Sequence, residues 1–380
     1  MKIVIAPDSF KESLTALEVC DAIEKGLSQA LSQLDCVKLP MADGGEGTVQ
    51  SLVDASGGSI HPVRVTGPLG DQVDAFFGMM GDGKTAVIEM AAASGLHLVP
   101  PSQRNPLLTT SYGTGELIKA ALEHGATHLI IGIGGSATND GGAGMAQALG
   151  IKLLDGEGRE IGYGGGALAR LASIDVSDKD PRLDALSIEV ACDVDNPLCG
   201  TTGASAIFGP QKGATPDMVM QLDTNLAHYG TLIQQQLGVE VTTVPGAGAA
   251  GGMGAALLGL LGAQLRPGIE IVIDAVDLAS AVKDADLVIT GEGRIDSQTI
   301  HGKTPFGVAK TAKAAGKSVI AIAGCMSEDY AVVHQHGIDA VFAVVPRSVS
   351  LEEALRDAAL NVEMTARNVA HALAVGKQMG

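Results

Sequence analysis

The segment from Asp286 to Pro305 gathers several ionisable side chains in a short stretch that also contains three glycines. Its apolar start, Leu287 to Thr290, predicts a buried strand. The loop expected to follow this strand carries two carboxylates, two cations and an imidazole, namely Glu292, Arg294, Asp296, His301 and Lys303. Carboxylates beside cations are the groups that phosphoryl transfer requires, because a proton must be accepted and phosphate charge must be neutralised.

A helix is predicted directly after this loop, with Thr304 as a possible N-cap and Pro305 at the first helical position. Open α/β sheets bind ligands where the ends of strands meet the starts of helices. A purely structural loop could be polar and glycine-rich with far fewer ionisable groups. The position and the side chains together therefore predict a ligand site.

Length and composition limit the classes of function. The chain has 380 residues, of which 46% are hydrophobic, and this suggests two globular domains. Net charge is -18, aromatic residues make up 3%, and Trp is absent, so a nucleic-acid-binding surface is not expected. A small anionic substrate is still compatible with this charge, since a local cluster of cations can bind it.

Cysteine usage and apolar segments indicate a cytoplasmic protein with no membrane partner. The five cysteines include no CxxC pair, and Met1 to Phe10 is too short an apolar run for a signal peptide. Val244 to Leu265 is uncharged and long enough to span a bilayer, but it is dominated by Gly and Ala. We therefore expect a small-residue helix packed inside the protein.

Both ends of the chain show alternating strand and helix patterns. Lys2 to Ala6 predicts a strand, Thr15 and Glu18 form a capping box, and a second strand is expected at Val37 to Leu39 before a helix that stops at Gly57. Towards the other end, strands are predicted at Ile271 to Ile273, Leu287 to Thr290, Ser318 to Ala323 and Ala340 to Val345, with a terminal helix over Leu351 to Ala374.

The middle of the chain has a different pattern. Strands at Val63 to Thr66, Val73 to Phe77 and Ala86 to Met90 are joined by Gly/Asp turns, which favours antiparallel pairing. We therefore predict two α/β domains. One is a doubly wound, mostly parallel sheet built from residues 1–60 and 275–380, and the other is an inserted mixed-sheet domain spanning residues 61–274.

Two familiar nucleotide-binding strings have simpler explanations. Gly78 to Thr85 matches the Walker A pattern, but the residues that follow predict a strand rather than the helix that a P-loop needs, so a hairpin turn is favoured. Gly246 to Gly251 matches GxGxxG without a clear preceding strand, so close helix packing is the favoured interpretation.

Four further loops combine glycine with polar groups. They are Asp8-Ser9-Phe10-Lys11, Asp43-Gly44-Gly45-Glu46-Gly47-Thr48, the segment from Gly134 to Gly142, and Asp193-Val194-Asp195-Asn196-Pro197. Glycines let a backbone approach a ligand, and helix starts provide free N–H groups. The alternatives are helix capping for the first loop, a plain turn for the second, a structural loop for the third and an Asx turn for the fourth.

At these loops the chain resembles the bacterial glycerate kinases also called glycerate 2-kinases. The resemblance covers nearly the whole chain and rests on five strings, which run from Ile5 to Lys11, Met41 to Thr48, Gly134 to Gly142, Phe208 to Ala214 and Thr290 to Thr299. It implies ATP-dependent phosphorylation of D-glycerate with Mg²⁺, usually at the 2-hydroxyl, by two α/β domains with the active site in the cleft between them. It also implies a role in glyoxylate and sugar-acid breakdown.

The chemistry of this reaction suggests roles for individual residues. The glycerate carboxylate is expected on Arg294, with Lys11 or Arg64 in reserve, and Ser9 and Asp8 are also expected to bind the substrate. Asp296 is the first choice for the base, with Asp195 as the second, and Lys303 would neutralise developing phosphate charge. Mg²⁺ is expected on Asp43, Glu292 and Asp140, and ATP phosphates on Gly44, Gly45, Gly134, Gly135, Ser136, Thr138, Asn139 and Lys212.

Several alternatives remain at this point. The product could be 3-phosphoglycerate, or the acceptor a related small hydroxy acid. A dehydrogenase that binds a dinucleotide at Gly246 to Gly251 and a non-catalytic binding protein are further alternatives from other classes. Either a monomer or a homodimer is compatible with the sequence.

Overall fold

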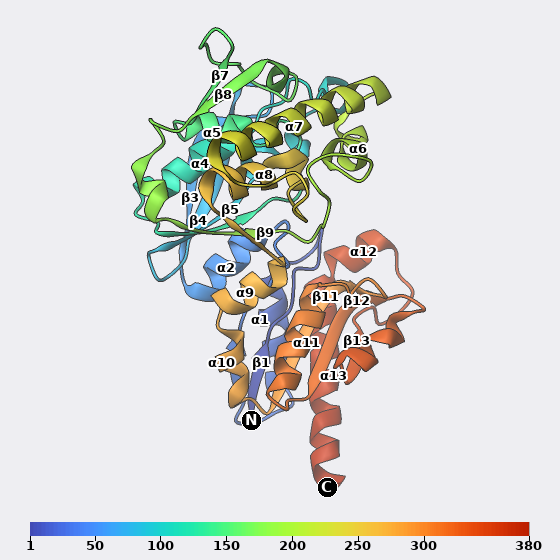
Figure 1. Cartoon of the computed structure of the whole chain (residues 1–380). Coiled ribbons are helices and arrows are strands. Elements are labelled where there is room, and N and C mark those ends of the chain that lie inside the picture. The colour runs from blue at the N-terminus through green and yellow to red at the C-terminus, as the bar shows by residue number, and fades with distance from the viewer. Residues whose placement is uncertain (380) are drawn as a thin grey trace. The chain divides into compact units, whose positions relative to one another are not determined.

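A computed structural model describes residues 1–379 of the chain (Figure 1). It divides into two compact units. Unit 1 comprises Met1–Asp43, Gln50–Gly57 and the chain from Ile269 onward, and unit 2 comprises Gly44–Val49 and Gly58–Gly268. The main divisions fall after Gly57 and after Gly268, where the sequence predicted 60 and 275, and the short loop Gly44–Val49 belongs to unit 2.

Unit 1 is built on one parallel sheet with the strand order β13-β12-β11-β1-β2. The strands are β1 (Lys2–Ile5), β2 (Asp35–Lys38), β11 (Leu287–Ile295), β12 (Val319–Met326) and β13 (Ala340–Ala343). The two halves of the unit join where β1 pairs with β11, with Ile3 in register with Leu287. The predicted parallel sheet with strands from both chain ends is therefore confirmed.

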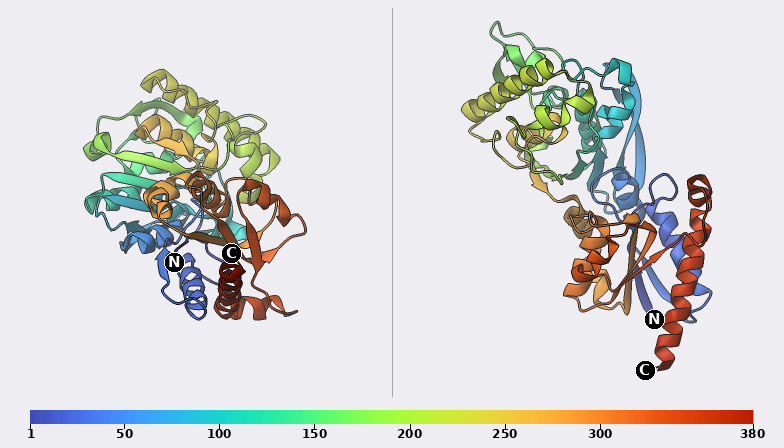
Figure 2. Two further views of the ribbon diagram at one scale, coloured as in Figure 1. Left: turned by 90° about the horizontal axis from the view of Figure 1, so that it is seen from below. Right: turned by 90° about the vertical axis from the view of Figure 1, so that its right-hand side faces the viewer.

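Helices cover both faces of this sheet (Figure 2). On one face, α1 (Ala16–Ser28) and α13 (Ala358–Met379) pack against each other and against buried isoleucines such as Ile3, Ile289 and Ile322. The other helices of the unit are α2 (Thr48–Ser56), α9 (Gly268–Ala275), α10 (Leu278–Lys283), α11 (Thr304–Ala314) and α12 (Leu351–Arg356). Consecutive apolar residues of the central strands are buried because helices cover both faces, as expected for a doubly wound sheet.

Local sequence signals predict some element boundaries correctly and others wrongly. The capping box of Thr15 and Glu18 is present at the start of α1. The strand predicted over Ile271 to Ile273 is wrong, because these residues form the helix α9. Ile269 and Ile273 pack there against Gly307 of α11, so tertiary packing outweighs the strand preference of β-branched residues. The terminal helix is interrupted at Asp357, between α12 and α13.

The strand expected to end at Thr290 continues to Ile295, and this changes how the site is positioned. Parallel pairing with β12 extends to Ile295, which lies opposite Met326. The backbone of β11 is therefore paired with β12 in a part of the chain where a loop was predicted. Glu292 and Arg294 thus lie on a strand two residues apart, and their side chains point to the same face of the sheet.

Unit 2 contains a six-stranded mixed sheet with the order β10-β9-β6-β5-β4-β3. Its first three strands along the chain are antiparallel and the remainder pair in parallel. They are β3 (Ser59–Thr66), β4 (Gln72–Met79), β5 (Thr85–Glu89), β6 (His128–Gly132), β9 (Ser187–Ala191) and β10 (Gln264–Arg266). The mixed sheet predicted for the inserted part of the chain is confirmed.

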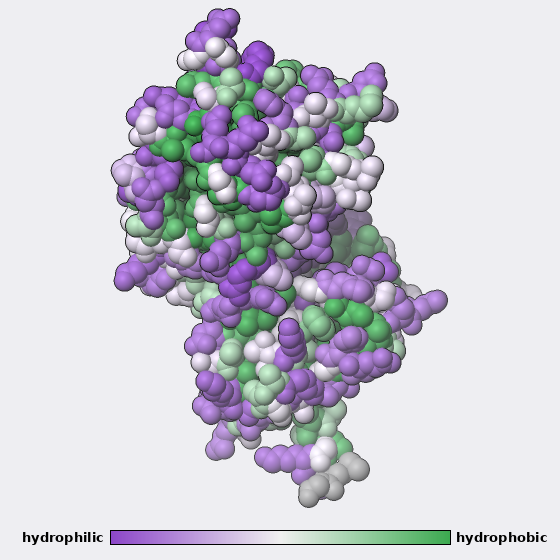
Figure 3. Space-filling view, viewed as in Figure 1, coloured by the Kyte–Doolittle hydropathy of each residue, from purple (hydrophilic) through white to green (hydrophobic). Residues whose placement is uncertain are grey.

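The helices of unit 2 are α3 (Ala91–Ser94), α4 (Tyr112–Glu123), α5 (Ala143–Ala148), α6 (Ala204–Phe208), α7 (Pro216–Leu237) and α8 (Ala249–Leu261). A separate antiparallel pair, β7 (Lys152–Asp155) and β8 (Leu171–Asp175), projects from this unit. Asp155 at the end of β7 and Glu157 in the turn that follows are linked by ion pairs to Arg159. The top of the molecule in Figure 3, where Figure 1 shows β7, is largely hydrophilic.

Both discounted motifs have structural explanations. The Walker-like string forms the turn between β4 and β5, where the Asp82 carboxylate accepts hydrogen bonds from the backbone N–H groups of Lys84 and Thr85. The string Gly246 to Gly251 is buried and leads into α8. A Cβ on Gly251 would lie 2.0 Å from the Thr138 carbonyl oxygen, so close backbone packing requires glycine there.

The segment Val244 to Leu265 forms the short helix α8 and its flanks, as the small-residue composition predicts. Within residues 1–379, the helices lack the combination of length and apolar character needed to cross a bilayer.

Candidate functional site

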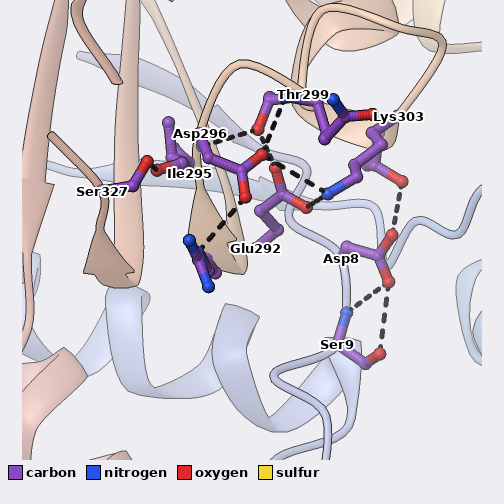
Figure 4. A network of polar contacts seen from close by, with 11 residues as sticks. Asp8, Ser9, Glu292, Ile295, Asp296, Thr299, Lys303 and Ser327 are labelled. Atoms are coloured by element: carbon purple, nitrogen blue, oxygen red, sulfur yellow. Dashed lines mark hydrogen bonds and ion pairs between the residues drawn. The ribbon is translucent and has the colours of Figure 1, made fainter. Parts of the chain in front are cut away.

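The ionisable groups of unit 1 gather at the carboxyl ends of β1 and β11 (Figure 4). Asp8 follows β1, Glu292 and Arg294 are on β11, and Asp296 comes directly after that strand. Because β1 and β11 are adjacent and parallel, their carboxyl ends share one edge of the sheet. Lys303 precedes α11 and reaches the same group of side chains.

Glu292 is the most buried acid of this group, with 9% of its surface exposed. It accepts a 2.6 Å hydrogen bond from Thr299 Oγ1, and Lys303 Nζ lies 3.6 Å from its other oxygen. Burial raises the pKa of Glu292 to about 7, and the negative charge of Asp8 acts in the same direction. Thr299 was not singled out from the sequence, since its role depends on the turn that brings it back to β11.

Asp296 has different partners from Glu292. Its carboxylate accepts a 2.8 Å hydrogen bond from the Gln298 backbone N–H and lies 3.2 Å from Arg294 Nε. Lys303 Nζ is 4.0 Å away, so this ammonium lies within ion-pair distance of both Glu292 and Asp296. The cluster thus joins two carboxylates through one lysine.

Asp8 links the loop after β1 to the start of α11. Its carboxylate accepts hydrogen bonds of 2.6 Å from the Ser9 backbone N–H and from Thr304 Oγ1. Burial, followed by the charge of Asp43, raises the pKa of Asp8 to about 6. The prediction that Thr304 caps α11 is wrong, because Thr304 is the first helical residue and its hydroxyl binds Asp8 instead.

Two cations beside this cluster are accessible to an anion. Arg294 has 64% of its side chain exposed although its Nε lies beside Asp296. Lys11 is also exposed, and its backbone lies against Gly293, where an added Cβ would be 3.7 Å from the Lys11 backbone nitrogen. The loop after β1 therefore lies beside β11 at ordinary van der Waals distance from Gly293.

The acids of unit 1 offer oxygen ligands of the kind that Mg²⁺ prefers. Asp8 interacts electrostatically with both Asp43 and Glu292. Across residues 1–379 there is no group of three acidic, His or Cys side chains arranged to hold a metal ion. Mg²⁺ usually takes one or two carboxylates and completes its shell with water and substrate phosphates, so a pair of these acids fits the ion.

In unit 2, the segment Gly134 to Gly142 follows β6 at the carboxyl end of the parallel strands. Gly134 and Gly135 are exposed, and Gly135 has a φ of +73°, a backbone conformation that favours glycine. The Gly135 carbonyl accepts a hydrogen bond from Leu96 N–H, whereas no acceptor is seen in residues 1–379 for the N–H groups of these two glycines. The loop therefore presents backbone donors to solvent.

The polar side chains behind this loop are buried. Thr138 and Asn139 have no exposed surface, and Lys212 has 1%. Lys212 Nζ donates to Ser136 Oγ at 2.8 Å and to the Thr138 carbonyl oxygen at 2.6 Å. Burial lowers the pKa of Lys212 to about 7, against an opposing effect of Asp140. None of these three side chains can touch a nucleotide in this conformation.

Asp140 is fully buried and serves as an acceptor for the surrounding backbone. Its carboxylate receives hydrogen bonds from Ser111 N–H at 2.9 Å, Ser111 Oγ at 2.7 Å, and the N–H groups of Gly142 and Gly144. Burial raises its pKa, and these hydrogen bonds oppose the rise. An acid enclosed by four donors fits a structural role in the loop, and it leaves the predicted role as a Mg²⁺ ligand without support.

One glycine of the other predicted phosphate loop, Gly44, has a packing role. A Cβ on Gly44 would lie 2.6 Å from Ala191 Cβ, so this residue needs to be small. Gly45 is half-buried beside it. The start of α2 is already capped, because Glu89 accepts a 2.9 Å hydrogen bond from Val49 N–H. Glu89 was missed in the sequence, since it lies 40 residues from the helix that it caps.

Asp195 is exposed and lies in unit 2, after the end of β9, whereas Asp296 belongs to unit 1. The strand β9 ends at Ala191, so Asp193 and Asp195 both lie beyond it. Asp193 accepts a 2.9 Å hydrogen bond from Gly268 N–H. The role of Asp195 as an alternative base stays a prediction.

The buried lysine should produce a measurable pH dependence of stability. A lysine with a folded pKa of about 7 and an unfolded pKa of about 10.4 binds more protons when unfolded, so stability rises with pH between these values. Relative to Lys212→Met, we expect the wild-type free energy of unfolding to increase from about pH 7 to about pH 8.5, by up to about 1.4 kcal/mol per pH unit. Urea unfolding of both proteins across this pH range would measure the difference. Parallel curves of unfolding free energy against pH for the two proteins would contradict the prediction.

Comparisons with known proteins agree with the resemblance of the motifs. The model of the glycerate kinase family matches residues 3–374. A glycerate kinase of Bacillus subtilis is 64% identical over 100% of this chain and 99% of its own length. A glycerate kinase of Haemophilus influenzae is 63% identical over 98% and 99%, and a glycerate 2-kinase of Escherichia coli is 61% identical over 99% of each.

The fold agrees with a solved structure as well. A crystal structure from Salmonella typhimurium LT2, of a protein assigned as glycerate kinase 2, superposes with a TM-score of 0.93 at 60% identity and covers 100% of both chains. Sequence, fold and the polar cluster at the sheet edge thus lead to the same result: the chain belongs to the glycerate kinase family and is a kinase.

Proposed function

We propose that this protein transfers the γ-phosphoryl group of ATP to the 2-hydroxyl of D-glycerate, yielding 2-phosphoglycerate and ADP. The observation that carries the proposal is the cluster of Glu292, Arg294, Asp296 and Lys303, which places two carboxylates and two cations together at the edge of the sheet. The naming of the Escherichia coli relative as a glycerate 2-kinase supports the choice of hydroxyl.

Asp296 is the proposed base. A kinase base has to accept the proton of the attacking hydroxyl as the bond to phosphorus forms. The Asp296 carboxylate is oriented by the Gln298 N–H and by Arg294, yet it is not fully enclosed. Glu292 is more deeply held by Thr299 and Lys303, which suits a group that binds a cation rather than one that approaches a substrate hydroxyl.

Mg²⁺ would be held by Glu292 and Asp43, with Asp8 close enough to both to contribute charge. When bound, this ion would neutralise phosphate charge during transfer. Lys303 adds a second positive charge at the start of α11, where the helix dipole also favours an anion. The exposed N–H groups of Gly134 and Gly135 would receive phosphate oxygens in unit 2.

The decisive experiment is ³¹P NMR of the product formed from ATP, Mg²⁺ and D-glycerate. We expect the resonance of 2-phosphoglycerate together with ADP. A 3-phosphoglycerate resonance would correct the regiochemistry, while ATP hydrolysis or ligand binding without a phosphorylated acid would contradict the proposal. Glycolate, lactate and tartronate in place of glycerate would test the related hydroxy acids.

The dehydrogenase alternative lacks a usable dinucleotide loop. Gly246 to Gly251 is buried, and Gly248 packs so tightly that a Cβ would lie 2.2 Å from the Pro197 carbonyl oxygen. An alternative as a non-catalytic binding protein explains neither the kinase relatives nor the paired acids and cations.

Arg294 is the proposed ligand of the glycerate carboxylate, because its guanidinium is exposed and can bind two oxygens at once. Arg294→Lys keeps the charge but loses the fork geometry. We expect KM for glycerate to rise about tenfold, roughly the effect of one charge-assisted hydrogen bond, with a smaller change in KM for ATP. Steady-state kinetics would measure both constants.

Arg356→Lys is the matched control for this prediction, since Arg356 forms an exposed ion pair with Asp357 elsewhere in unit 1. It should leave both constants near their wild-type values. If Arg294→Lys behaved like this control, the glycerate carboxylate would have to bind elsewhere, with Lys11 as the next candidate.

A further inference from the structure

The most unusual group outside the cluster of unit 1 is the buried ammonium of Lys212. This residue ends a single 3-10 turn, Pro210–Lys212, and its side chain crosses to the loop after β6. There Nζ donates to Ser136 Oγ at 2.8 Å and to the Thr138 carbonyl oxygen at 2.6 Å. Only 1% of the residue is exposed, so both hydrogen bonds are shielded from water.

The same loop is held on its other side by neutral groups. Leu96 N–H donates to the Gly135 carbonyl oxygen at 2.8 Å, and Ala137 N–H donates to the Ser94 carbonyl oxygen at 2.9 Å. Thr109 Oγ1 donates to the Ala137 carbonyl oxygen at 3.0 Å. Along the loop, these hydrogen bonds alternate with the two that Lys212 donates. Lys212 thus restrains Ser136 Oγ and the Thr138 carbonyl oxygen, which no neighbouring backbone group does.

The loop needs such restraint because two consecutive glycines form its exposed part. Gly134 has open space around it, and Gly135 has a φ of +73° that few other residues adopt. Glycine pairs have wide conformational freedom, and a backbone that binds an anion must present its N–H groups in one arrangement. Fixing the Ser136 side chain and the Thr138 carbonyl group limits the conformations that Gly134 and Gly135 can take.

A lysine is a costly way to fill this space. Burying an ammonium carries a desolvation cost, which an apolar side chain of similar length would avoid. In return, its amino group donates two hydrogen bonds that an apolar side chain could not make, and a lysine can donate both even when burial keeps it neutral above about pH 7.

We propose that Lys212 is a positioning residue for nucleotide binding. It holds Ser136 and Thr138 so that the N–H groups of Gly134 and Gly135 are preorganised for phosphate oxygens, and it does not contact the nucleotide itself. The identity of the anion as a nucleotide phosphate rests on the proposed function, whereas the restraint of the loop does not.

The restraint can be tested without any ligand. In Lys212→Met, which keeps the length of the side chain but removes both hydrogen bonds, amide hydrogen exchange in residues 134–139 should accelerate at least about tenfold. Thr85→Val is the matched control. Thr85 is also buried in unit 2 and its hydroxyl donates a 2.7 Å hydrogen bond to the Asp82 carboxylate, so its loss should destabilise the unit without accelerating exchange in this loop.

Steady-state kinetics test the consequence for the nucleotide. Lys212→Met should raise KM for ATP at least about tenfold, while kcat changes less than about threefold and KM for glycerate is unchanged. Ser136→Ala should raise KM for ATP by a smaller factor. The double variant should be no worse than Lys212→Met alone, because both substitutions remove the same restraint.

Two results would overturn the inference. One is unchanged loop exchange in Lys212→Met, and the other is a loss of kcat of about 10²-fold with additive effects of Ser136→Ala, which would indicate direct contact with the transferred group. If Lys212→Met does not fold, Ser136→Ala alone decides the question. Unchanged amide exchange in the loop, or an unchanged KM for ATP, would then contradict the positioning role. A wild-type enzyme that does not use ATP would instead refute the proposed function, and the ligand-free exchange result would still stand.

Discussion

Asp296→Asn is expected to lower kcat by at least about 10²-fold, the usual contribution of a general base. The substitution removes the basic oxygen that would accept the proton of the glycerate hydroxyl. It keeps an amide oxygen that can still accept the hydrogen bond from the Gln298 N–H, so the turn after β11 should survive. Initial rates at saturating ATP and glycerate, with circular dichroism to verify folding, would measure the effect.

Asp329→Asn is the control for this substitution. Asp329 is a neighbouring acid with a comparable role in the turn, where it accepts a 3.3 Å hydrogen bond from the Ser297 backbone N–H. It takes no part in the proposed chemistry, so its variant should turn over normally. A folded Asp296→Asn enzyme with near-normal kcat would remove Asp296 as the base and make Glu292 the next acid to test.

Lys303→Met is expected to have the second large effect, a fall in kcat of about 10²- to 10³-fold, as is typical when a group that stabilises developing charge is lost. Lys303 Nζ is within 4.0 Å of both Glu292 and Asp296, so its removal also leaves two nearby carboxylates without their shared counter-ion. The loss should appear mainly in kcat, because phosphate charge develops most strongly during transfer.

Lys310→Met tests whether any lysine of this region would have the same effect. Lys310 is exposed on α11, seven positions beyond Lys303 in the chain, and its substitution should leave kcat unchanged within about twofold. Equal activities of the two variants would show that Lys303 does not act on the transferred phosphoryl group. A Lys303→Met enzyme with raised KM and normal kcat would assign it to binding alone.

The parallel sheet of unit 1 could be predicted because its evidence is local. Short β-branched strands such as Val319–Met326 alternate with helices that carry recognisable caps, as at Thr15 and Glu18. The error at α9 shows the limit of this evidence, since Ile271 to Ile273 has strand preference but packs as a helix against α11. Propensity over three residues is too weak to oppose a buried interface.

The sequence predicted which residues form the cluster, and the structure corrected how they are arranged. Glu292, Arg294, Asp296 and Lys303 were identified from one short segment, because they lie within twelve positions of each other. Their arrangement depends on β12, which extends β11 to Ile295 and so places Glu292 and Arg294 on one face. The link from Asp8 to Thr304 spans 296 positions, and no local pattern predicts it.

By itself, the sequence determined the α/β class, the family and the chemical types in the site, because strand and helix periodicity, capping and motifs are encoded in neighbouring residues. Only the tertiary structure decided which polar groups face solvent and which are enclosed. Lys212 and Asp140 read as ligand-binding groups in the sequence, yet both are buried by residues distant in the chain. Burial and hydrogen-bond partners are properties of long-range packing, so a residue's type can suggest its chemistry but not whether a substrate can reach it.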